Sequence, residues 1–151
     1  MYGVQIQHVS SVPLAVVRRQ VHPSEFSRVV PECCGVVWQV VRAQQTRAGR
    51  HVAICWDETI RLEVGVELDG PFVEDRDVVH SATPAGLVAS TTHLGPYGGL
   101  ARARDAIRQW CTANNRVLAG PRWEIYGHWL EEWDKDPSQI RTDLYYLLSE
   151  S

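Results

Sequence analysis

The chain has 151 residues, 44% of them hydrophobic and 22% charged, a composition typical of one globular domain large enough to bury a core. Its formal net charge of -3 argues against a nucleic-acid-binding surface, which is usually strongly basic. No apolar run is long enough to span a bilayer, and the N-terminus lacks the pattern of a signal peptide. Four cysteines without a C-x-x-C pair suit a reducing compartment, so we expect a cytoplasmic protein without direct nucleic-acid or membrane partners.

In the first half of the chain, hydrophobic periodicity predicts two strands, a helix and two further strands. Residues 3–9 alternate apolar and polar side chains, and residues 14–21 continue in extended form. A helix is predicted over residues 31–45, because valines recur there at helical spacing and the first residue is a proline. Residues 52–56 read as a strand, and the strict alternation of residues 62–69 predicts a strand with one buried face.

The second half uses the same order of elements again, after a linker over about residues 70–81. The predicted unit is strand, helix, strand, strand, which places the chain in the α+β class. Its elements are, in order, a strand over 87–93, a helix that starts at Gly95-Pro96 and ends near Asn114, and strands over 123–129 and 140–148.

The two halves also align residue by residue, at an offset of 71 positions. An internal repeat indicates two copies of one unit related by a pseudo-twofold axis. We therefore predict a single domain over residues 1–151, with a first repeat over about 1–70 and a second over about 82–149. The matching segments are 13–17 with 84–88, 52–55 with 123–126 and, where the offset has grown to 80, 60–64 with 140–144.

Glu124 is the clearest difference between the repeats, because its counterpart is Ala53. Alternation along residues 123–129 places Glu124, Tyr126 and His128 on one face of their strand. In the last strand the face with Leu144 is expected to lie under the helices, so Tyr145 points the other way. We therefore expect Glu124, Tyr126 and Tyr145 to share the face away from the helices. Their counterparts are small, which leaves room for a cavity: Ala53, Cys55 and Gly65.

A carboxylate between aromatic rings suits a flat, hydrophobic cation, because the carboxylate supplies charge and the rings supply cation–π attraction. The alternative interpretation is a Glu124 on a solvated surface, paired with a nearby arginine. Arg102, Arg104 and Arg108 fit best as the solvated face of a helix. Six scattered histidines show no metal-ligand spacing, so neither a metal nor another cofactor is expected. Weaker ligand-binding candidates, for which core packing or a place at the rim competes, are Trp38, Tyr97, Trp56 and His128.

Several short motifs occur in a characteristic order along the chain. They are Glu63-Val64-Gly65-Val66-Glu67, His93-Leu94-Gly95-Pro96-Tyr97, Gly120-Pro121, Glu124-Ile125-Tyr126 and Thr142-Asp143-Leu144-Tyr145. This ordered set resembles the GyrI-like small-molecule-binding domain of the SOUL/GyrI-like superfamily, over nearly the whole chain. That family includes the effector-binding domains of multidrug-responsive transcription activators.

The resemblance implies a pseudo-twofold antiparallel sheet with two helices on one face and a ligand cleft on the other. In the family a strand glutamate lies in the cleft and meets cationic, lipophilic compounds, and Glu124 is the position that matches. The leading hypothesis is therefore a stand-alone protein that senses or sequesters hydrophobic, often cationic compounds. Since residues 1–9 already belong to the first strand, any action on transcription would need a protein partner such as a transcription factor.

Two other functions of the same family remain open from the sequence, because one fold can carry all three. Some GyrI-like proteins are hydrolases of cyclopropane-bearing, DNA-alkylating natural products. In that case Glu124 would be the general base, and Tyr126 or Tyr145 would orient the substrate or donate a hydrogen bond. The third possibility is a partner role, such as binding to gyrase, which no residue specifically favours.

Overall fold

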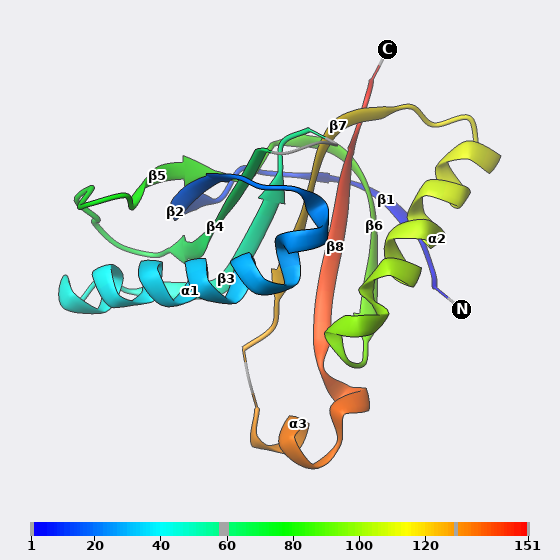
Figure 1. The fold of residues 1–151 in the computed structure, drawn as a ribbon. Helices are drawn as coiled ribbons and strands as arrows, with labels where there is room; N and C mark the ends of the chain where they lie inside the picture. The colour runs from blue at the N-terminus through cyan, green and yellow to red at the C-terminus, as the bar shows by residue number, and fades with distance from the viewer. Residues whose placement is uncertain (1, 58–60, 129, 151) are drawn as a thin grey trace.

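The computed structural model describes residues 2–57, 61–128 and 130–150. The longer helices are α1 (Phe26–Ala43) and α2 (Leu100–Ala113), and a short helix α3 (Glu131–Lys135) lies beyond the end of the sheet (Figure 1). Three single 3-10 turns are η1 (Pro23–Glu25), η2 (Tyr97–Gly99) and η3 (Pro137–Gln139). The strands are β1 (Gln5–Val9), β2 (Pro13–Gln20), β3 (Ala48–Cys55), β4 (Arg61–Leu68), β5 (Val79–Ala82), β6 (Gly86–Leu94), β7 (Leu118–Tyr126) and β8 (Arg141–Leu148).

All eight strands form one antiparallel sheet, in the order β1-β6-β8-β7-β3-β4-β2-β5. Each strand of the first half has a counterpart four numbers later: β1 corresponds to β5, β2 to β6, β3 to β7 and β4 to β8. When every strand is replaced by its counterpart, the same order is obtained in reverse. At the centre, β3 pairs with β7, and Ala53 lies opposite Glu124. These two residues are also the counterparts in the 71-residue alignment. The strand order is therefore the one that a pseudo-twofold axis between Ala53 and Glu124 would produce.

Each long helix covers its own half of the sheet. The buried face of α1 packs on β2, β3 and β4, and that of α2 packs on β6 and β8 (Figure 1). The predicted α+β class with two helices on one face is confirmed. Between the two helices, β3 meets only the edge of α1 and β7 packs closely under neither helix, so the centre of the sheet is the least covered part of this face. Tyr126 of β7 borders the apolar clusters under both helices. The opposite face of the sheet has its own core, made of Leu14, Val16, Val52, Ile54, Val88, Trp123 and Ile125.

The predicted start of the first helix is wrong, because α1 begins at Phe26 and contains Pro31. Proline removes one backbone hydrogen bond, the one that the carbonyl of Ser27 would accept. The apolar stripe of α1 already begins at Val29, which is buried, and continues through Cys33. Burial of that stripe offsets the local cost of the proline.

Two further expectations change in the structure. The linker predicted over residues 70–81 contains the start of β5, which pairs with β2. The four residues of this edge strand are too few for alternation to reveal. The strand predicted over residues 123–129 ends as β7 at Tyr126, and Trp129 lies outside the described residues. No helix in the described part of the chain is long and apolar enough to cross a membrane.

Strand β4 is buried on both faces rather than on one. Leu62, Val64 and Val66 lie under α1, while Glu63 and Gly65 are buried on the other face. On that second face Arg18 and Ser81 cover Glu63, and at Gly65 β2 and β4 approach closely: a Cβ atom there would overlap the backbone carbonyl oxygen of Ala15. Only glycine fits at this position.

We predict that Gly65→Ala lowers the free energy of unfolding by about 3 kcal/mol or more, since the backbone of β2 must move away. The matched control is Gly35→Ala in α1, where a Cβ meets nothing within 4 Å. Alanine is the better helix former, so this change is expected to stabilise the protein by about 0.5–1 kcal/mol. Urea unfolding of both variants measures the difference, and equal effects would contradict the close approach.

Candidate functional site

The uncovered centre of the sheet forms the floor of a cleft between α1 and α2. Alternate residues of β3 and β7 point toward the helix side, and the register pairs them across the two strands. The three pairs are His51 with Tyr126, Ala53 with Glu124, and Cys55 with Arg122. The β3 side of the floor is therefore small at its centre, while the β7 side is charged and aromatic.

The walls come from the N-terminal parts of the two helices. Along α1 the lining residues follow helical spacing, and so do those of η2 and α2. The volume of the cleft is about 520 Å³, within the range of small-molecule sites. Several wall residues are counterparts at the 71-residue offset: Phe26 and Tyr97, Ser27 and Gly98, Val30 and Ala101.

The cleft lies on the helix face of the sheet, so the expected position on the opposite face is wrong. In β8, Leu144 lies under α2, as predicted. The register of β7 with β8 places Glu124 directly opposite Leu144, and residues opposite each other in an antiparallel pair share a face. Glu124 and Tyr126 therefore face the helices. Tyr145 faces away from them, where its ring stacks on Trp123 at 5.4 Å between centroids.

Glu124 is almost fully enclosed, at 4% exposure, and its carboxylate accepts hydrogen bonds from two side chains. Arg104 of α2 donates through Nε to Oε2 at 2.6 Å and through Nη2 to Oε1 at 3.2 Å. The Tyr126 hydroxyl donates to Oε1 at 3.2 Å. Arg122 adds an ion pair, with Nη1 3.5 Å from Oε2. The carboxylate is thus held by two guanidinium groups and a phenol.

Burial and this carboxylate control the ionisation of the neighbouring groups. Burial, together with the charge and hydrogen bond of Glu124, raises the pKa of Tyr126 well above its usual value, so Tyr126 stays a neutral donor. Burial lowers the pKa of Arg104, but the hydrogen bond and charge of Glu124 more than offset this. Burial also lowers the pKa of His51, which is therefore neutral at pH 7.

Of the seven ligand-binding candidates from the sequence, the structure brings Glu124, Tyr126 and Tyr97 together. The Tyr97 ring meets the Tyr126 ring edge-on, with centroids 5.7 Å apart. Trp38 is 45% exposed on α1 and lies 6.3 Å from the ring of His51, outside the lining. His128 is exposed beyond the end of β7 and is not part of the lining either.

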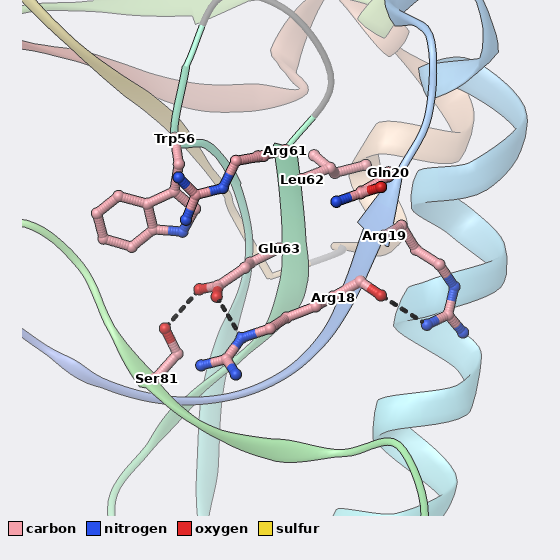
Figure 2. A pocket seen from close by; sticks show the side chains of 8 residues that line it. All are labelled: Arg18, Arg19, Gln20, Trp56, Arg61, Leu62, Glu63 and Ser81. Carbon is pink, nitrogen blue, oxygen red and sulfur yellow. Dashed lines mark hydrogen bonds and ion pairs between the residues drawn. The ribbon is translucent and has the colours of Figure 1, made fainter.

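Trp56 borders a different cavity, of about 620 Å³, at the end of β2 and β4. Figure 2 shows the Glu63 carboxylate turned toward Arg18 and Ser81, with the indole of Trp56 on its other side. Arg18 is a surface residue, with 62% of its side chain exposed. We regard the cleft between the helices as the better candidate, because apolar walls and convergent polar groups are typical of small-molecule sites.

Sequence reasoning missed two residues of the cleft, Arg104 and Arg122. The sequence pattern predicts a solvated helix face for Arg104, but in the structure it lies next to the apolar stripe and its side chain turns inward to Glu124. Its spacing of seven residues from Tyr97 and three from Ala101 is the signal that places it on the cleft side of α2. Arg122 lies two residues before Glu124 in β7, so the two side chains point to the same face of the sheet. Among the described residues, no group of three or more potential ligands could hold a metal ion.

We predict that Glu124→Gln lowers the free energy of unfolding by about 2 kcal/mol, because it leaves two guanidinium groups without their carboxylate. Part of that loss should return in the double variant Glu124→Gln/Arg104→Gln, which removes one of the two uncompensated charges. Urea unfolding of the four proteins gives the coupling energy, expected near 1 kcal/mol. Additive effects would mean that the ion pair contributes no stability.

We also predict slow, strongly pH-dependent alkylation of Cys34, which lines the cleft. Burial, with a smaller contribution from Cys33, raises the pKa of the Cys34 thiol to about 11. The reactive thiolate is therefore scarce at pH 8, and iodoacetamide should react roughly a hundredfold more slowly than with a free cysteine. The rate should climb with pH and level off only near 11. Subtracting the rate of Cys34→Ser isolates this residue, and a plateau near pH 8.5 would contradict the prediction.

Comparison with solved structures supports the same architecture. EcmrR in complex with DNA has a TM-score of 0.80 at 16% identity, and the match covers 99% of this chain and 58% of that chain. The chain therefore spans less than two thirds of EcmrR. The C-terminal domain of EcmrR alone has a TM-score of 0.78 at 15% identity, with 100% and 99% covered.

Two other similar structures differ in their described roles. SAV2435 bound to tetraphenylphosphonium has a TM-score of 0.71 at 10% identity, with 98% of this chain and 94% of that chain covered. A hydrolase from Listeria innocua, encoded by lin2189, has a TM-score of 0.62 at 11% identity, with 97% and 91% covered. At these identities the likeness establishes the fold alone. No curated protein matches the chain.

The sequence itself matches a family whose members are described as GyrI-like small molecule binding domains, over residues 3–148. Because this match covers almost the whole chain and the structural likeness agrees with it, the protein belongs to the GyrI-like small molecule binding domain family.

Proposed function

We propose that the protein binds hydrophobic small molecules in the cleft between α1 and α2, and so acts as a sensor or a sequestering protein. The observation that carries this proposal is the composition of the cleft. Its helix walls are largely apolar, and its polar groups converge on one point of the floor, Glu124. That combination orients a ligand while most of its surface is removed from water.

The ligand we expect is a flat or globular aromatic compound of drug size. The rings of Tyr97 and Tyr126 provide contact area, and Phe26 and Val30 face them from α1. The tetraphenylphosphonium bound by SAV2435 is a hydrophobic cation, which makes cations reasonable ligands to test for this chain. A cation that reached the Glu124 carboxylate would have to take the place of Arg104 there.

The geometry favours binding over hydrolysis. A general base needs a free lone pair directed at the water that it deprotonates. A carboxylate has about four acceptor positions, and in Glu124 three of them are taken by Nε and Nη2 of Arg104 and by the hydroxyl of Tyr126, while the guanidinium of Arg122 lies beside Oε2. We therefore assign Glu124, with Tyr126 as its hydrogen-bond donor, to ligand orientation; Tyr145 lies on the other face of the sheet, stacked on Trp123, and takes no part in this cleft.

The test is to fill the cleft from its floor. Ala53 lies opposite Glu124, so the ring of Ala53→Phe would occupy the space above the carboxylate. We expect the affinity for tetraphenylphosphonium and for a neutral aromatic dye to fall at least about tenfold, as measured by titration calorimetry. The control is Ala113→Phe, an exposed position at the end of α2. Both variants are first checked for folding by circular dichroism, and unchanged affinity in Ala53→Phe would place the binding site elsewhere.

A further inference from the structure

The charged groups that line the cleft do not balance. Two guanidinium groups, those of Arg104 and Arg122, face a single carboxylate, that of Glu124. His51 adds no charge at neutral pH, since burial lowers its pKa. Within the described lining, one positive charge is in excess; outside the lining, the charge of Asp57 also reaches Cys55 of the floor. In a cleft whose charged groups are largely buried, solvent screens such an excess less than at an open surface, so it acts on a charged ligand.

We propose that the guanidinium group of Arg104 occupies the Glu124 carboxylate in the place that a cationic ligand would take. Arg104 thereby makes the cleft prefer neutral and anionic hydrophobic compounds. This inference rests on the proposed function, because it concerns the ligands of the same cleft. It assigns Arg104 as the residue that determines specificity, by competing with a cationic ligand for the carboxylate.

The contacts of Arg104 explain why it is a strong competitor. It approaches Glu124 with two parallel donors, Nε at 2.6 Å and Nη2 at 3.2 Å, and this bidentate geometry matches the two oxygens of a carboxylate. The guanidinium is tethered to α2, so its effective concentration at Glu124 exceeds that of a dissolved ligand. A hydrophobic cation without hydrogen-bond donors offers only charge in exchange.

Release of Arg104 would not leave Glu124 free for a cation. The side chain of Arg104 is 27% exposed, so it has access to water at the edge of the cleft. Arg122 stays beside the carboxylate, with Nη1 3.5 Å from Oε2 and only 16% of its side chain exposed. An entering cation would then meet a nearly neutral pair rather than an unpaired negative charge.

An anion finds the opposite situation. A guanidinium carries five N–H donors, and on Arg104 only two of them, one on Nε and one on Nη2, donate to Glu124. The positive excess therefore attracts an anionic group while the ion pair stays intact. A neutral aromatic compound also leaves the pair intact and gains from the apolar walls.

The experiment compares tetraphenylphosphonium with tetraphenylborate, which have the same shape and opposite charge. Calorimetry gives the ratio of their affinities for the wild type, for Arg104→Gln and for the control Arg102→Gln. Arg102 is exposed on the same helix and does not line the cleft, so its variant makes the same change in net charge elsewhere. We expect wild type to prefer the anion, and Arg104→Gln to shift the ratio toward the cation by at least about tenfold. Arg102→Gln should shift it by less than about twofold.

The outcomes separate the inference from the proposed function. A ratio that stays the same in Arg104→Gln, or weaker cation binding there, would overturn the role of Arg104 while cleft binding stands. Saturable binding of neither ion to any variant would reject both. If Arg104→Gln does not fold, Arg104→Lys replaces it, because lysine keeps the charge but loses the paired donors. Cation affinity is then expected to rise about threefold, and no rise would contradict the proposal.

Discussion

The antiparallel pairing of β3 with β7 is the contact on which both the sheet and the cleft depend. It joins the two halves of the chain, since every other neighbour of these strands belongs to the same half. It also places Ala53 opposite Glu124, so that a small residue leaves space directly beside the carboxylate. Because α1 and α2 each cover their own half, the pair is the part of the sheet over which a cavity can remain.

Within that frame the two halves of the chain differ more in the chemistry of their side chains than in the order of their strands. The walls keep similar pairs, such as Phe26 and Tyr97, while the floor differs: β3 contributes Ala53 and β7 contributes Glu124. A symmetric cleft with a carboxylate on both strands would place like charges opposite each other, which is destabilising. With Glu124 on β7 opposite Ala53 on β3, that repulsion is absent and the polar groups of the floor are gathered on the β7 side of the cleft.

Much of the fold could be predicted from local patterns. Alternation and helical spacing located the central strands and both long helices, although β3 and β7 begin four and five residues earlier than predicted, at Ala48 and Leu118, and the start of α1 also differs. The start of α1 differs because Pro31 predicts a helix boundary, whereas burial of Val29 before it sets where the helix begins. The edge strand β5 was missed because its stability comes from β2, which is distant in the sequence.

The sequence by itself determined the α+β class, the internal offset of 71 residues and the choice of Glu124 and Tyr126 as neighbours on one strand face. These follow from periodicity, which a chain carries locally. Only the tertiary structure decided which side of the sheet that face is, because alternation within a strand does not specify the register with its neighbour. It alone showed Arg104 on Glu124, since the approach of a helix side chain to a strand depends on how the two elements pack.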